Sequence, residues 1–242
     1  MSDTDRPVAI ITGAGRGIGR ATAIELADEG YRVCLAARTR EELEATRAAT
    51  GLAPPDSLIV LVDLAQAQAP SNLLETTLDL YGRVDVLVNN AGWAPPRRSL
   101  VKTSEADQDR MLAVNLRAPI ALTRLAAARM LQQGGGAIIN IASTAGLRSP
   151  ALEAVYAAAK AGLIAFSRAC FNELRGSGVK VSVVIPGLVD TALIPPNKHL
   201  DRTRMLAPQA VARAVTRIIK APAEICPVEL VLEPSRNPER AR

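Results

Sequence analysis

The chain alternates short apolar runs with longer segments whose apolar residues recur at the spacing of a helix. Several short runs are apolar at every position, as expected for strands with helices packed on both faces of their sheet. This alternation predicts an α/β fold with one doubly wound parallel sheet of about seven strands, flanked by helices on both faces. The predicted strands are VAIIT (8–12), RVCLAA (32–37), SLIVLVD (57–63), VDVLVNN (84–90), GAIINIAS (136–143), KVSVVIP (180–186) and PVELVLE (227–233).

Length and composition predict a single domain spanning residues 1–242. A chain of 242 residues with 48% hydrophobic content is long enough to bury one core, and no segment reads as an interdomain linker. Residues 235–242 are mostly polar and include three arginines, so we expect a flexible tail there.

Cysteine usage and hydropathy indicate a cytoplasmic protein. Cys34, Cys170 and Cys226 are odd in number and lack paired spacing, which argues against a disulfide framework and against a metal site. The acidic start of the chain does not resemble a signal peptide, and no apolar run reaches the roughly 20 residues of a membrane span. We therefore expect a reducing compartment, no metal and no membrane association.

The net charge does not indicate a nucleic-acid partner. The formal charge is +5, but the basic residues are scattered along the chain and only 2% of residues are aromatic. A nucleic-acid site normally combines a clustered basic patch with aromatic side chains that stack on bases. A small molecule is therefore the expected partner.

The segment TGAGRGIG, residues 12–19, follows the first predicted strand and begins an amphipathic helix. Gly13, Gly17 and Gly19 lack a Cβ, so the backbone N–H groups can approach a pyrophosphate at the positive end of the helix. A tight turn without a ligand is the alternative, and the position between first strand and helix disfavours it. The loop predicts a dinucleotide site of the Rossmann type.

The end of the second strand bears on the choice of coenzyme. A site selective for NAD normally carries an acidic residue there, which binds the ribose 2′-hydroxyl. In this chain Ala37 occupies that place and Arg38 follows it. Arg38 can pair with the 2′-phosphate of NADP, and Arg16 in the glycine loop can flank it. We therefore expect NADP(H), with NAD less favoured.

With these motifs in order, the chain resembles the short-chain dehydrogenase/reductase family along nearly its whole length. The resemblance implies a coenzyme loop at residues 12–19, an aspartate that contacts adenine, a motif after the fourth strand, four catalytic residues and a segment that contacts nicotinamide. The matching positions are Gly13, Arg16, Gly17, Ile18, Gly19, Arg38 and Asp63; Asn90, Ala91 and Gly92 of NNAG; Asn115, Ser143, Tyr156 and Lys160; and Pro186, Gly187 and Thr191 of PGLVDT.

Tyr156 and Lys160 lie four residues apart, on one face of a predicted helix. A tyrosine can protonate a developing alkoxide, and a neighbouring ammonium lowers its pKa toward neutral. The resemblance implies that Lys160 also binds the nicotinamide ribose, that Ser143 binds the substrate oxygen and that Asn115 holds a water. The implied activity interconverts a secondary alcohol and a ketone or aldehyde, with a 3-oxoacyl or 3-hydroxy-acid substrate among the candidates. The alternative is a catalytically silent NADP-binding redox sensor.

Three local features leave alternatives open. Pro119 cannot donate to the carbonyl of Asn115 if one helix runs through both, but it can equally sit in the first turn of a new helix. Trp93 either lines the substrate cleft or fills a loop. Arg148 either binds an anionic substrate or is solvated, and residues 188–206 have the length and composition of a mobile lid.

The predicted helix over residues 152–174 carries apolar side chains around its whole circumference. A helix that covers one sheet face needs only one apolar stripe, so the surplus predicts a second buried face. The family resemblance places a subunit contact at this helix, and we therefore expect a homodimer or a homotetramer.

Overall fold

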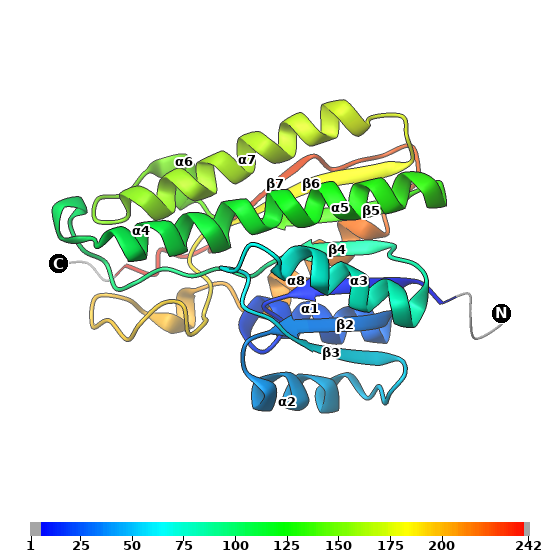
Figure 1. Ribbon diagram of the computed structural model, residues 1–242. Coiled ribbons are helices and arrows are strands. Elements are labelled where there is room, and N and C mark those ends of the chain that lie inside the picture. Colours follow the sequence, from blue (N-terminus) through cyan, green and yellow to red (C-terminus); the bar gives the residue numbers. More distant parts are fainter. Residues whose placement is uncertain (1–5, 240–242) are drawn as a thin grey trace.

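The computed structural model describes residues 6–239, in which seven parallel strands form one sheet (Figure 1). The strand order is β3-β2-β1-β4-β5-β6-β7, so the order reverses between β1 and β4. Ligands of open α/β sheets bind outside the carboxyl ends of the strands at such a reversal. The strands are β1 (Val8–Thr12), β2 (Arg32–Ala37), β3 (Ser57–Leu61), β4 (Val86–Asn89), β5 (Gly136–Ile141), β6 (Val179–Pro186) and β7 (Glu229–Leu232).

Helices cover both faces of the sheet, and the fold class predicted from the sequence is confirmed (Figure 1). One face packs against α1 (Gly17–Asp28), α2 (Arg40–Thr50) and α8 (Pro208–Ile219). The other packs against α3 (Ala69–Tyr81), α5 (Ala118–Gln133) and α7 (Ala154–Leu174). The shorter helices are α4 (Glu105–Leu112) and α6 (Ala145–Arg148), with 3₁₀ turns η2 (Leu100–Lys102) and η4 (Arg202–Arg204).

The continuous apolar character of the inner strands follows from this layering. Ile11 of β1 and Leu35 of β2 belong to the core under α1, α2 and α8, whereas Ile10 and Cys34 belong to the core under α3 and α5. Because successive side chains point to opposite faces, both positions of the alternation must be apolar. The edge strand β7 is more exposed.

The helix that contains Asn115 and Pro119 continues through both residues. A π-helical turn, η3 (Ala113–Arg117), joins α4 to α5 without a break, and the Ala118 N–H donates to the Ala113 carbonyl five residues earlier. The wider turn accommodates a proline that has no N–H to donate. Of the two alternatives drawn from the sequence, the continuous helix is therefore the correct one.

Two boundaries differ from the sequence expectation. Helix α7 begins at Ala154, two residues after the predicted start, because Leu152 has a φ of 69°, outside the helical region. In the predicted tail, Pro238 is buried and its carbonyl accepts a hydrogen bond from the Asp201 N–H at 2.8 Å. That part of the tail is docked on the chain, while residues 240–242 lie outside the described residues.

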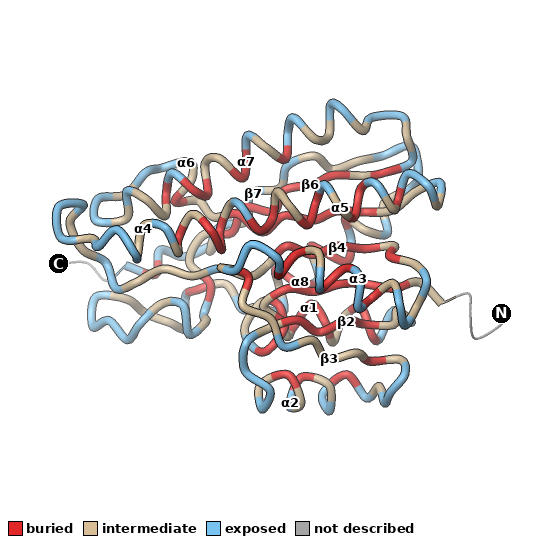
Figure 2. Tube along the Cα trace, viewed as in Figure 1, coloured by how far each residue is buried: buried red, intermediate tan, exposed pale blue. Residues whose placement is uncertain are grey.

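Two helical stretches have the length and hydropathy of a membrane span, Glu105–Gln133 and Ala154–Leu174, each with a mean hydropathy of 1.2. Helices α5 and α7 within these stretches pack against the sheet, and Figure 2 marks their buried residues in red. Core helices of this kind pass a test based on length and composition alone, so the two stretches are weak evidence for a membrane location.

Candidate active site

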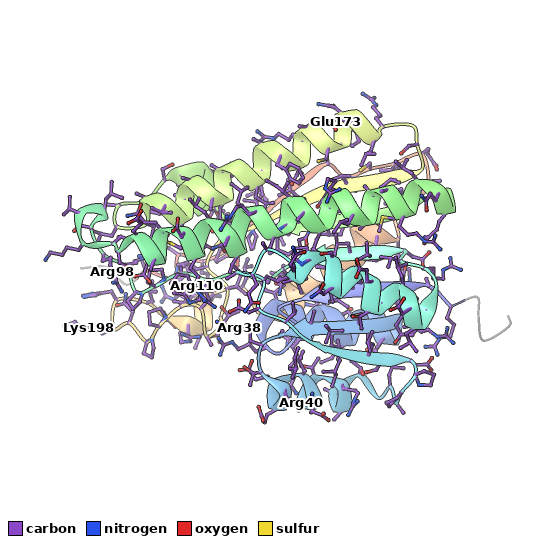
Figure 3. All side chains as sticks on the ribbon, in the orientation of Figure 1. Arg38, Arg40, Arg98, Arg110, Glu173 and Lys198 are labelled. Atoms are coloured by element: carbon purple, nitrogen blue, oxygen red, sulfur yellow. The ribbon has the colours of Figure 1, made fainter. Side chains whose placement is uncertain are left out.

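A cleft opens at the carboxyl ends of the strands, where the strand order reverses. Figure 3 shows Arg38 and Arg110 at this cleft, between α4 and the β2 half of the sheet. Most of the site residues predicted from the sequence line it: Gly13, Arg16, Ile18, Arg38, Asp63, Asn90, Ala91, Gly92, Ser143, Tyr156, Lys160, Pro186, Gly187 and Thr191. Gly17, Gly19 and Asn115 are not among the residues that line it, and Gly19 and Asn115 are buried.

The glycine loop leaves no room for side chains at its key positions. Gly13 has a φ of 65°, and a Cβ there would lie 2.9 Å from Asn90 Nδ2. A Cβ on Gly19 would lie 2.2 Å from the Gly13 carbonyl oxygen, so only glycine lets α1 pack this closely. Asn90 Nδ2 in turn donates to the Thr12 carbonyl at 2.9 Å, which ties the loop to the end of β4.

The amino end of α1 fits an anionic group. No side chain caps it at Arg16, and its first turn contains no acidic residue. The first N–H groups of a helix have no intrahelical acceptor and carry partial positive charge. Together with the glycine loop they suit the pyrophosphate of a dinucleotide, so the residues present fit the cofactor that the sequence predicts.

Three arginines and two carboxylates surround the far end of the cleft. Arg38 is exposed and has no acidic residue beside it at the end of β2. Arg16 NH1 lies 3.3 Å from Glu42 Oε1, an ion pair that the sequence did not predict. Asp63 accepts from the Ala65 N–H at 3.1 Å and from Arg110 NH2 at 3.0 Å. Although burial alone would raise the pKa of Asp63, these hydrogen bonds hold it below its ordinary value.

Arg110 and Trp93 meet on the wall of the cleft. The Arg110 guanidinium carbon lies 5.5 Å from the centroid of the Trp93 ring, a cation–π distance. Trp93 therefore lines the cleft, which decides the alternative that the sequence left open. No motif points to Arg110, because its partner Asp63 is 47 residues away in the chain. Only the fold brings these two residues together.

Ser143, Tyr156 and Lys160 meet at the other end of the cleft. The Ser143 and Tyr156 hydroxyls share a hydrogen bond, and the Ala145 N–H donates to Ser143 Oγ at 3.1 Å. Lys160 is 3% exposed, and its Nζ donates to the Ile141 carbonyl at 2.9 Å. The same Nζ lies 5.8 Å from the centroid of the Tyr156 ring. The last strand residue of β5 thus holds the lysine beside the tyrosine.

The acidity of these two residues differs from the sequence prediction. Burial raises the pKa of Tyr156 to about 12, with the Ser143 hydrogen bond acting against this and the Glu153 carboxylate adding to it. Burial also lowers the pKa of Lys160 to about 8. The expected lowering of the tyrosine pKa is therefore wrong for this structure, because burial of the ring outweighs the hydrogen bond from Ser143. At neutral pH Tyr156 carries its proton.

Asn115 is fully buried and positions the loop after β4. Its Nδ2 donates to the carbonyls of Trp93 at 2.6 Å and Met111 at 2.9 Å, and its Oδ1 accepts from the Trp93 N–H at 3.2 Å. A Cβ on Gly92 would lie 3.2 Å from Asn115 Oδ1 and 3.9 Å from Lys160 Nζ. Gly92 thus lies next to both the Asn115 and the Lys160 side chains. The role of Asn115 in holding a water stays a prediction.

The expected lid is tied at its base by backbone hydrogen bonds. The Leu206 N–H donates to Leu188 and the Leu206 carbonyl accepts from Asp190, both at 2.9 Å. Arg202 adds hydrogen bonds to the Asp190 carboxylate at 2.7 Å and to the carbonyls of Thr191 and Ile194, both at 3.0 Å. Leu193 and Ile194 line the cleft and give this side an apolar surface.

The Arg148 side chain forms an ion pair outside the cleft. Its NH2 lies 2.6 Å from Glu233 Oε1, the side chain is 68% exposed, and it is not among the residues that line the cleft. The suggestion that it binds an anionic substrate is therefore unsupported, and the solvated charge is the better description.

Within residues 6–239, no group of three His, Cys, Asp or Glu side chains is arranged to hold a metal ion.

Comparisons with known proteins agree with this geometry. Residues 7–200 match the family model described as short chain dehydrogenase. An uncharacterized oxidoreductase of Staphylococcus aureus (strain USA300) is 33% identical over 232 residues, which cover 96% of this chain and 98% of the relative. A metagenomic short-chain oxidoreductase solved in complex with NADP is 35% identical, with a TM-score of 0.83 and coverage of 95% and 98%.

A 3-ketoacyl-(acyl-carrier-protein) reductase from Brucella melitensis, solved with NADH, has a TM-score of 0.87 at 26% identity and coverage of 97% and 99%. The matched family model spans most of the chain, and the glycine loop and the serine, tyrosine and lysine lie in one cleft. The chain therefore belongs to the short-chain dehydrogenase family of oxidoreductases.

Proposed function

We propose that this protein is an NADP(H)-dependent oxidoreductase that interconverts a secondary alcohol and a ketone or aldehyde, with Tyr156 as the acid and base. The observation that carries the proposal is the meeting of Tyr156, Ser143 and Lys160 in the cleft that also contains the glycine loop. A proton donor next to a dinucleotide site is what hydride transfer to a carbonyl requires.

A bound nicotinamide supplies the hydride in reduction and accepts it in oxidation. The hydroxyls of Ser143 and Tyr156 hydrogen-bond the substrate carbonyl oxygen. As the carbonyl carbon gains the hydride, the oxygen becomes an alkoxide, and the O–H bond of Tyr156 breaks as its proton passes to that oxygen. The charged form of Lys160 stabilises the phenolate that remains, and a proton from water then restores the tyrosine. Oxidation follows the reverse order.

The acidity of the two side chains suits reduction at neutral pH. A tyrosine with a pKa of about 12 is fully protonated there and ready to donate. A lysine with a pKa of about 8 is mostly charged at pH 7 and loses its charge as the pH rises through 8. Support for the phenolate therefore weakens in mildly alkaline solution.

The preference for NADP(H) rests on charge at the adenosine end of the cleft. Arg16 and Arg38 both line the cleft, and Ala37 stands where an NAD-selective site has a carboxylate. The metagenomic relative solved with NADP supports this choice, while the Brucella melitensis structure contains NADH. NAD(H) is therefore the second coenzyme to test.

The same Brucella melitensis structure, a 3-ketoacyl reductase, supports a 3-oxoacyl substrate. The side of the cleft formed by Leu193 and Ile194 suits an apolar chain next to the reacting carbonyl. A 3-oxoacyl or 3-hydroxy-acid compound is accordingly the first substrate class to assay.

The test measures consumption of NADPH and NADH with ketones, 3-oxo acids, 3-oxoacyl thioesters and quinones. Tyr156→Phe keeps the ring and removes the proton donor, so we expect turnover to fall about 10³-fold or more while coenzyme binding stays intact. Trp93, the single tryptophan of the chain, lies in the cleft and reports binding by energy transfer to the reduced nicotinamide. Tight binding without turnover on any substrate would favour a redox sensor instead.

We also propose a cytoplasmic homodimer or homotetramer. Ala158, Ala165 and Ala169 are exposed on the outer side of α7, and Leu131 of α5 is 46% exposed. Two copies that bury these faces against each other would account for the surplus apolar residues of α7. Light scattering of the purified protein tests this, and a monomer would contradict it.

A further inference from the structure

Glu42 is an acidic residue at the cationic end of the coenzyme cleft. It lies in the first turn of α2 and lines the cleft together with Arg16 and Arg38. Its Oε1 is 3.3 Å from Arg16 NH1, and its Oε2 is 2.9 Å from the position that a Cβ on Gly15 would occupy. The carboxylate therefore lies directly against the glycine loop.

The fold holds Glu42 in this place. Thr46, one turn later in α2, is fully buried, and its hydroxyl lies 2.9 Å from the Ala14 carbonyl and 3.2 Å from the Gly15 carbonyl. The same hydroxyl is 3.0 Å from the backbone carbonyl of Glu42. This buried hydroxyl fixes the backbone of the first turn of α2 against the glycine loop, so the Cα of Glu42 is held beside the cleft.

The other charged residues of α2 pair with one another or lie outside the cleft. Arg40 lies 3.7 Å from Glu44, and Arg47 lies 2.6 Å from the same carboxylate. Glu41 is exposed and does not line the cleft. Glu42 is thus the residue of this helix whose charge acts on the dinucleotide.

We propose that Glu42 sets the coenzyme selectivity of the protein by competing with the 2′-phosphate of NADP(H) for Arg16. This inference rests on the proposed function, because it assumes that a dinucleotide occupies the cleft. With NAD(H), the Arg16–Glu42 pair stays intact. With NADP(H), Arg16 exchanges a carboxylate for a phosphate, and Glu42 is left facing a group of like charge. The carboxylate therefore reduces the advantage of NADP(H) over NAD(H).

The effect should be moderate, because the pair is partly solvated. The Arg16 side chain is 62% exposed and that of Glu42 is 36% exposed, so solvent screens their interaction. We expect Glu42→Gln to lower the dissociation constant of NADPH about two- to fivefold, as for one exposed charge pair, and to change that of NADH less than about twofold.

The experiment measures both dissociation constants by energy transfer from Trp93 in the full chain. Glu41→Gln is the matched control, since it removes the same charge from the same helical turn outside the cleft. We expect the control to leave both constants within about twofold. In an Arg16→Gln background, the gain from Glu42→Gln should shrink, because the competition no longer exists.

The outcomes separate this inference from the proposed function. If the wild type binds NADPH but Glu42→Gln leaves its dissociation constant unchanged, or strengthens NADH equally, the role of Glu42 is disproved and the proposed function stands. A wild type that binds neither dinucleotide would overturn both. A gain in NADPH affinity that is retained in full in the Arg16→Gln background would also overturn the competition for Arg16.

Discussion

The two ends of the coenzyme cleft are built in opposite ways. At the catalytic end, Asn115 is fully buried and Lys160 is 3% exposed, and backbone groups hold both side chains. At the adenosine end, Arg16 is 62% exposed and pairs with the side-chain carboxylate of Glu42, and Arg38 is also exposed. A buried group acts through fixed geometry in a low dielectric, whereas solvent and salt screen an exposed one. Chemistry should therefore be sensitive to single changes, and coenzyme choice should be adjustable.

The largest effect is expected from Lys160→Met, which removes the buried ammonium beside Tyr156. The phenolate then forms without a neighbouring positive charge, and kcat should fall about 10³-fold. Lys180→Met is the control, because Lys180 also donates to backbone carbonyls, those of Ala221 and Pro222, but lies outside the cleft. Steady-state kinetics measure kcat for both variants. A fall in kcat of less than about tenfold in Lys160→Met would contradict the expectation that the buried catalytic end is sensitive to single changes.

A smaller effect, on stability, is expected from Asn115→Ala. The change leaves the Trp93 N–H and two carbonyl groups without their buried partner. We expect a loss of about 1–3 kcal/mol in the free energy of unfolding. Asn197→Ala, which removes one exposed contact to the His199 N–H, should cost less than about 0.5 kcal/mol. Denaturant unfolding compares the two, and equal losses would show that burial of Asn115 is not decisive.

Glu153→Gln should shift the pH dependence of alcohol oxidation to lower pH. In the proposed mechanism oxidation needs the phenolate of Tyr156, and the Glu153 carboxylate raises the pKa of that tyrosine. Removing the carboxylate lowers the pKa, so the phenolate forms at lower pH. Arg97 forms an ion pair with Glu153, so Arg97→Gln should shift the profile in the opposite direction. Shifts of the same sign in the two variants would disprove this coupling.

The smallest effect is expected from salt. Raising the ionic strength from about 0.05 to 0.5 M shortens the Debye length and weakens the attraction of the exposed Arg16 and Arg38 for a 2′-phosphate. The KM for NADPH should rise a few-fold, while kcat stays constant because the catalytic end is buried. Initial rates across a salt series measure both quantities. A fall in kcat with an unchanged KM for NADPH would show that salt acts on the catalytic end and not on the adenosine end.

The sequence predicts the fold well because the apolar pattern that marks each strand lies within a few consecutive residues. Each strand is a run of apolar residues, and each observed strand begins and ends within two residues of its prediction. The β-α-β alternation then limits the sheet to a parallel arrangement. The start of α7 could not be placed this way, because the backbone of Leu152 is set by the loop that carries it.

The site residues likewise divide into those that a local motif predicts and those that it does not. Residues within contiguous motifs, such as Gly13 and Tyr156, could be assigned from their order along the chain. Glu42 and Arg110 could not, because their partners lie 26 and 47 residues away and meet them only in the folded chain. The acidity of Tyr156 could not be predicted either, since the sequence shows the neighbouring lysine but not the loss of water around the ring.

The closed base of the expected lid makes residues 192–205 an exchangeable cassette for engineering that leaves Thr191 of the cleft in place. Leu188 and Leu206 are joined by a backbone hydrogen bond, so the ends of any replacement segment start from adjacent anchor points. Doubling the length of such a loop costs only about 0.6 kcal/mol of closure entropy. New substrate ranges are therefore best sought by grafting lids of different length and sequence onto an otherwise unchanged chain.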